Sequence, residues 1–155
     1  MSKVASIVIK SNVNNIKKAL RQGVLERAAL AGGEVIRNHA KLNIRSTFSA
    51  KSKGGAGLAG SMIVELVKSS STSAEVDVGP TKIYGRIQEL GGIIKPVFKK
   101  MLSWIGDDGV RIFAHQVRIP PRPYLRPALD NHKQEIEDAV HAQIEQGITN
   151  SLVKL

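Results

Sequence analysis

The sequence feature that most constrains the fold is a long run of apolar residues at helical spacing near the N-terminus. Apolar side chains recur at steps of three, four or seven over roughly 13–44, which predicts one long helix with an apolar stripe. The stripe consists of Ile16, Leu20, Val24, Ala28, Ala31, Val35 and Leu42. Small residues around Gly32-Gly33 would let another element approach this helix closely, and a bend at the glycine pair is the alternative.

Strand patterns lie on both sides of this helix. Residues 4–9 are apolar and largely β-branched, which indicates a short first strand. Residues 46–61 are dominated by Gly, Ser, Ala and Lys and predict a long mobile loop. The alternating segments 62–68 and 73–79 are separated by serines and are typical of an antiparallel hairpin.

The second half of the chain predicts a short helix, a long hairpin and a last helix. Residues 81–92 favour a helix that ends at Gly91, with Ile83, Ile87 and Leu90 on one face. Residues 93–118 favour an extended hairpin that turns at Asp107-Asp108-Gly109. Four prolines between positions 120 and 127 exclude a regular strand there, and Pro127 suits the first position of a helix over about 127–150. The apolar stripe of that helix consists of Leu129, Ile136, Val140, Ile144 and Ile148.

Together these patterns predict a single α+β domain over residues 1–155. We expect a long N-terminal helix and a C-terminal helix packed on an antiparallel sheet of about four strands. The mobile loop 46–61 and the extended hairpin 93–118 complete the expected fold. The longest apolar runs are too short to span a bilayer, so we expect no membrane partner.

Catalytic and metal-binding motifs are weak throughout. The chain has no cysteine, which excludes disulfides, thiolate zinc sites and thiol catalysis. The glycine-rich stretch 54–60 lacks the Lys-Ser/Thr ending of a phosphate-binding loop. The four histidines form no HxxxH or HExxH pair, and a metal site would need distant residues to converge, which spacing cannot show. We therefore predict no enzyme, no catalytic residue, no cofactor and no metal. The histidines are His39, His115, His132 and His141.

Charge is unevenly distributed along the chain. The net charge is +10, with eleven basic and two acidic residues in positions 1–60, against two basic and five acidic in positions 128–155. Such a dipolar molecule favours contact with polyanions or head-to-tail contact between copies. A candidate basic patch consists of Lys41, Arg45, Lys51 and Lys53. It is a solvated helix face, a phosphate-contacting surface or a contact with an acidic protein surface, and the residues alone leave these alternatives open.

The segment IPPRPYLRPALD at 119–130 is the most distinctive stretch of the chain. Its proline-rich backbone is stiff and would project Arg122, Tyr124 and Arg126 at alternate positions. It either clamps the last helix to the sheet or offers a docking strip, and local physics does not decide between the two.

This segment, combined with YGRIQELGG at 84–92, resembles a family of small tail-completion or head–tail joining proteins of long-tailed double-stranded DNA phages. That family is often called gene-product-ten-like after a lambdoid phage, and the same segments resemble the related Mu-type virion morphogenesis proteins. GLAGSM at 57–62 resembles the family signal that enters the first hairpin, and the resemblance covers roughly residues 16–145. The hairpin 93–118 departs from the pattern by its length. The matching motif positions are Tyr84, Gly85, Glu89, Gly91, Arg122, Pro123, Tyr124, Leu125, Arg126, Pro127 and Ala128.

The resemblance implies a structural role in the virion. Members of this family form a ring, with six copies expected, where the tail tube and its terminator meet the head connector, and DNA passes through the central channel. The implied partners are further copies of the chain and the tail and connector proteins, with direct DNA contact open. The alternative, which follows from the charge, is a basic module that binds nucleic acid without sequence preference.

Overall fold

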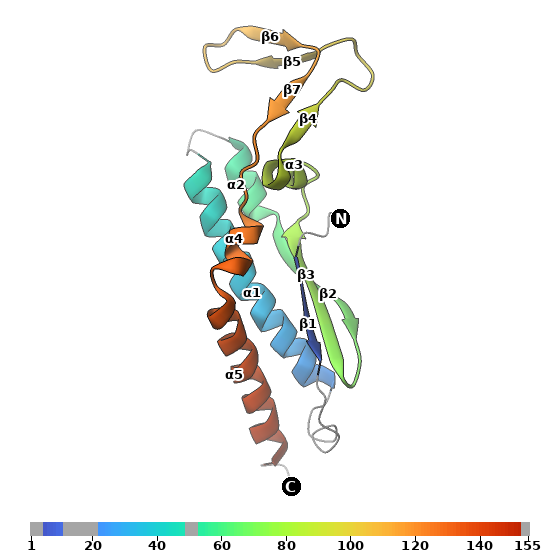
Figure 1. Cartoon of the computed structure of the whole chain (residues 1–155), viewed down its shortest axis with the longest axis vertical. Helices are drawn as coiled ribbons and strands as arrows, with labels where there is room; N and C mark the ends of the chain where they lie inside the picture. The colour runs from blue at the N-terminus through green and yellow to red at the C-terminus, as the bar shows by residue number, and fades with distance from the viewer. Residues whose placement is uncertain (1–4, 11–21, 49–52, 153–155) are drawn as a thin grey trace. The chain divides into compact units, whose positions relative to one another are not determined.

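A computed structural model describes residues 5–10, 22–48 and 53–152, and the chain divides into two compact units (Figure 1). The first unit comprises the residues before Tyr84 and those from Tyr124 onward, and the second is Tyr84–Pro123. Helices and antiparallel strands make up both units, which confirms the predicted α+β class. Within the described residues, no helix combines the length and the apolar content that crossing a bilayer requires.

The first unit contains a three-stranded antiparallel sheet in the order β1-β3-β2. The strands are β1 (Ala5–Lys10), β2 (Met62–Ser69) and β3 (Ser73–Pro80), so the predicted first strand and hairpin are confirmed. Side chains of the central strand β3 alternate between buried and half-buried positions, as expected for a strand with one face on a core. The buried members are Ala74, Val76, Val78 and Pro80.

Helix α1 (Gln22–Thr47) packs against this sheet and against the C-terminal helix (Figure 1). The start predicted for this helix, residues 13–21, lies outside the described residues. The predicted stripe is correct at Val24 and Ala28 but wrong at Leu42, whose side chain is 56% exposed. In the first half of the helix the buried face includes the predicted positions and their neighbours, whereas in the second half it runs through Ile36, Ala40 and Ile44 and not through Val35 and Leu42. Its fully buried members include Leu25, Ala29, Ile36, Ala40 and Ile44.

The glycine pair in the middle of α1 permits close packing on two sides. A Cβ added at Gly33 would lie 2.6 Å from Val64 Cγ1 on β2, and one added at Gly32 would lie 3.0 Å from Val140 Cγ2 on the C-terminal helix. Ordinary Cβ atoms essentially never come within 3.0 Å of a neighbouring heavy atom, so a larger residue at 33 would push the helix from the sheet. The helix is continuous through the pair, as the close-approach interpretation predicts.

The sequence predicted a mobile loop over 46–61, and this prediction is wrong for most of the residues of that segment that the structure describes. Helix α1 runs to Thr47, Phe48 is buried, and α2 (Lys53–Gly60) is helical despite its glycines. Leu58 and Ala59 are almost fully buried in the first unit. Burial of these two side chains against α1 overrides the poor helix propensity of the segment. Residues 49–52 lie outside the described residues.

The last helix predicted over 127–150 is two helices. They are α4 (Leu125–Asp130) and α5 (Lys133–Leu152), separated at Asn131-His132. Pro127 is the third residue of α4, not the first, but it still lies in the first turn, where its missing N–H leaves no hydrogen bond unmade. Helix α5 lies along α1 and contacts it closely, with Ile136, Ile144 and Ile148 facing the shared core.

The second unit consists of a short helix and two separate antiparallel ribbons. Helix α3 (Gly85–Leu90) starts four residues later than predicted and ends at Gly91 as predicted. The expected hairpin 93–118 turns at Asp107–Gly109, where the Val110 N–H donates to Asp108 Oδ1 at 3.0 Å. The predicted four-stranded sheet is wrong, because these strands form two ladders separate from the sheet of the first unit. The pairs are β4 (Gly92–Ile94) with β7 (Val117–Ile119), and β5 (Leu102–Ile105) with β6 (Arg111–Ala114).

Candidate functional site

The two sequence motifs that carry the phage resemblance meet in the second unit. The Arg122 N–H donates to the Gln88 carbonyl oxygen at 2.7 Å, which joins the proline segment to α3. Gly91 has φ +70°, and a Cβ there would lie 2.8 Å from the Pro121 nitrogen and 3.0 Å from the Ile119 oxygen. Glycine is therefore required at 91 for both its backbone conformation and its contact with the proline segment.

Tyr84 and Glu89 of the first motif are structural residues in this arrangement. Tyr84 precedes α3 and is half-buried, while Glu89 within α3 is only 3% exposed although it carries a carboxylate. A carboxylate this deeply buried is out of reach of a partner outside the chain. The first motif thus contributes Glu89 to the interior of the unit and Arg86 and Leu90 to its surface.

The remainder of the proline segment is divided between core and surface. The Tyr124 side chain is fully buried in the first unit, and the Tyr124 carbonyl oxygen accepts a hydrogen bond from Asn43 Nδ2 at 3.0 Å. This contact ties the start of α4 to α1, whereas the predicted clamp joined the last helix to the sheet, and Leu125 is also buried. Arg122, Pro123 and Arg126 are exposed, and Pro127 is half-buried. Arg126 Nε lies 3.8 Å from Asp130 Oδ2, and the two residues form an exposed ion pair across one turn of the helix.

Apolar side chains are exposed along the ribbons of the second unit. In the β5–β6 ladder Leu102 pairs with Ala114 and Trp104 with Ile112, so these four side chains share one face. Trp104 is 40% and Ile112 39% exposed, and on the opposite face Ile105 is 66% and Phe113 57% exposed. Phe98, in the connection between β4 and β5, is 99% exposed. We call the residues Leu102, Trp104, Ile112 and Ala114 the ribbon face.

The basic patch is only partly described. Lys41 and Arg45 lie one turn apart near the end of α1, where Lys41 is half-buried and Arg45 exposed. Lys51 lies outside the described residues, and Lys53 is the first residue of α2, with its side chain undescribed. The four-residue patch therefore stays a prediction.

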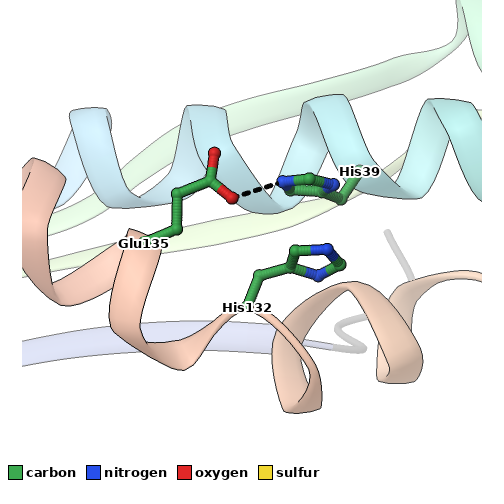
Figure 2. Close-up of side chains that lie close together, drawn as sticks. All are labelled: His39, His132 and Glu135. Atoms are coloured by element: carbon green, nitrogen blue, oxygen red, sulfur yellow. Dashed lines mark hydrogen bonds and ion pairs between the residues drawn. The ribbon is translucent and has the colours of Figure 1, made fainter.

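A cluster of two histidines and a glutamate, which sequence reasoning missed, lies in the first unit (Figure 2). His39 is on α1, His132 is in the break between α4 and α5, and Glu135 is in the first turn of α5. His39 Nε2 lies 2.7 Å from Glu135 Oε2, and the two imidazole rings are stacked, with centroids 3.4 Å apart and planes inclined by 18°. Only the fold brings residues so distant in sequence together. The one local signal was the HxxE spacing of His132 and Glu135.

No protein-family model matches the chain, and neither a curated protein nor a solved structure matches it.

Proposed function

We propose that the chain is a structural protein of a tailed double-stranded DNA phage, a tail-completion subunit that forms a ring between the tail tube and the head connector. The observation that carries the proposal is the contact between YGRIQELGG and the proline segment, the two stretches that resemble the phage family. The hydrogen bond from Arg122 to Gln88 and the close approach of Pro121 to Gly91 make them one structural element.

The exposed ribbon face supports an assembly role. An isolated two-stranded ribbon is at best marginally stable in water and gains stability when another layer covers its apolar face. Contiguous apolar side chains at a surface mark interaction sites in many proteins. Burial of Trp104 and Ile112 against a neighbouring subunit would remove apolar surface from water on both chains.

Charge supports contact between copies of the chain. The segment 84–123 carries seven basic and three acidic side chains, whereas α5 carries one basic and four acidic. Glu137, Asp138 and Glu145 of α5 are exposed and so are accessible to a neighbour. A head-to-tail interface between unlike surfaces repeats around a ring when its rotation closes, and opposite charges guide such an encounter.

The test is deletion of the gene in the phage or prophage that carries it. We expect DNA-filled heads and separate, unattached tails in electron micrographs, with infectious yield restored by the wild-type gene supplied in trans. A Trp104→Ser/Ile112→Ser double variant should fail to restore yield, whereas the control Gln116→Ser, at an exposed and uncharged position outside the ribbon face, should restore it. Unchanged yield after deletion, or a virion map without copies of the chain at the neck, would reject the proposal.

Sequence-independent binding of nucleic acid is the other function to test. The net charge of +10 favours it, but the described residues place only Lys41 and Arg45 of the expected patch. Salt-dependent binding of the isolated chain to duplex DNA, together with normal particle assembly after deletion, would favour this alternative.

A further inference from the structure

The assembly role does not use the cluster of His39, His132 and Glu135. The candidate ligand atoms of these residues all lie within 4.8 Å of one another, although His39 and Glu135 are 96 positions apart in the sequence (Figure 2). We propose that the cluster binds one divalent transition-metal ion through one nitrogen of each imidazole and one oxygen of Glu135. Two imidazoles and a carboxylate form a ligand set that suits Zn²⁺ and neighbouring ions, such as Co²⁺ and Ni²⁺.

The protonation of His132 suits a metal ligand. Its Nδ1 lies 3.2 Å from the Ala128 carbonyl oxygen, and because a carbonyl oxygen only accepts, Nδ1 carries the hydrogen. In the neutral ring Nε2 is then the nitrogen with the free lone pair. Metal-binding histidines commonly donate their second ring nitrogen to a backbone carbonyl, which fixes both the tautomer and the ring orientation. The backbone of α4 thus prepares His132 to bind through Nε2.

The pair of His39 and Glu135 supplies the other two ligands. With 2.7 Å between His39 Nε2 and Glu135 Oε2, a proton lies between the two atoms in the structure. A metal ion takes the place of that proton, which either moves to Nδ1 of His39 or leaves to solvent. The stacked rings must rotate about their Cβ–Cγ bonds to direct both lone pairs at one ion, a movement confined to side chains.

Exposure leaves room for water on the ion. The side chain of Glu135 is 56% exposed and that of His39 is 23% exposed, so one side of the cluster faces solvent. Three protein ligands would leave at least one coordination position for water. Since His39 belongs to α1 while His132 and Glu135 flank the start of α5, the bound ion would tie the two helices together. Binding that requires the folded arrangement stabilises the folded chain.

The experiment uses tag-free full-length protein treated with a chelator and then dialysed. Calorimetric titration with Zn²⁺ should give one ion per chain, and Zn²⁺ should raise the midpoint of thermal unfolding. Co²⁺ should show visible absorption bands typical of nitrogen and oxygen ligands. His39→Gln, His132→Gln and Glu135→Gln should each weaken binding about tenfold or more, because each removes a direct ligand.

The matched control is His141→Gln, which removes an exposed histidine on α5 outside the cluster. This variant should bind Zn²⁺ like the wild type. Glu135→Gln keeps the size of an exposed side chain, so it should fold even if a histidine variant does not, as circular dichroism would verify. Two outcomes overturn the proposal: a wild-type chain that binds no Zn²⁺, Co²⁺ or Ni²⁺, or a Glu135→Gln variant that folds and binds them with unchanged affinity.

Discussion

Replacement of Gly147 by alanine tests a close contact between the two long helices. A Cβ at this position of α5 would lie 2.6 Å from Val24 Cγ2 and 3.1 Å from Val24 Cβ. Val24 is 3% exposed and β-branched, so its side chain has no free space and few rotamers to use. The substitution therefore forces α5 away from α1.

Two opposing terms set the size of the effect. Alanine favours a helix interior over glycine by about 1 kcal/mol, whereas overpacking a well-filled core costs about 1–3 kcal/mol. We expect Gly147→Ala to lower the free energy of unfolding by about 1–2 kcal/mol, because the contact is with atoms close to the Val24 backbone. Urea unfolding followed by circular dichroism measures this as a lower midpoint at constant slope.

Gly23→Ala is the matched control within α1. A Cβ at Gly23 meets only Arg27 Nη1, at 3.8 Å, so this change should stabilise the chain by up to about 1 kcal/mol. In a Val24→Ala background, Gly147→Ala should cause little loss in the free energy of unfolding, because the clashing methyl groups are absent. A double-mutant cycle would measure this coupling between positions 24 and 147. If Gly147→Ala stabilises the wild-type background as much as Gly23→Ala does, α5 does not lie on α1 at Val24 and the reasoning is refuted.

Three further substitutions test the packing of individual residues. Tyr124→Ala should cost about 2–4 kcal/mol of stability, since its ring is fully buried, with a smaller loss for Tyr124→Phe, and an unchanged denaturation midpoint would contradict the burial of the ring. Gly91→Ala should accelerate hydrogen exchange at the Arg122 amide, because φ +70° and the contact with the proline segment both disfavour a Cβ; unchanged exchange would place the two motifs apart. Phe98→Ser should change stability by less than about 0.5 kcal/mol, since the side chain is 99% exposed, and a thermal midpoint lowered by several degrees would show that Phe98 is buried.

Periodic and turn-forming segments were predictable from the sequence. Alternation identified β2 and β3, the Asp108-Gly109 pair identified the turn of the long hairpin, and Gly91 identified the end of α3. Each of these features depends on residues close in sequence, so local patterns determine them. The helical period also identified α1 and its buried face at Val24 and Ala28, but it misplaced that face in the second half of the helix. A helical repeat is compatible with a stripe through Leu42 and equally with one through Ile36 and Ile44. Packing against the sheet and α5 determines that Ile36 and Ile44 are buried and Leu42 is exposed.

The remaining features depend on contacts that spacing does not show. Helix α2 exists because Leu58 and Ala59 are buried, against the propensity of a glycine-rich segment. The break after Asp130 places His132 outside α5, whereas the sequence predicted a single helix over about 127–150. The candidate metal cluster could be predicted only in part, because His39 reaches it through the packing of α1.

The order of the elements along the chain has a consequence for synthesis on the ribosome. The face of α1 that carries Val24 and Leu25 is covered partly by β3 and partly by α5. About 85 residues must be translated between the end of α1 and the start of α5, which takes on the order of ten seconds at about 5–20 residues per second. During that interval part of an apolar helix face of the nascent chain stays exposed to solvent. Helix α5 can cover its part of this face only after its own residues have left the ribosome, so the core of the first unit closes late in synthesis.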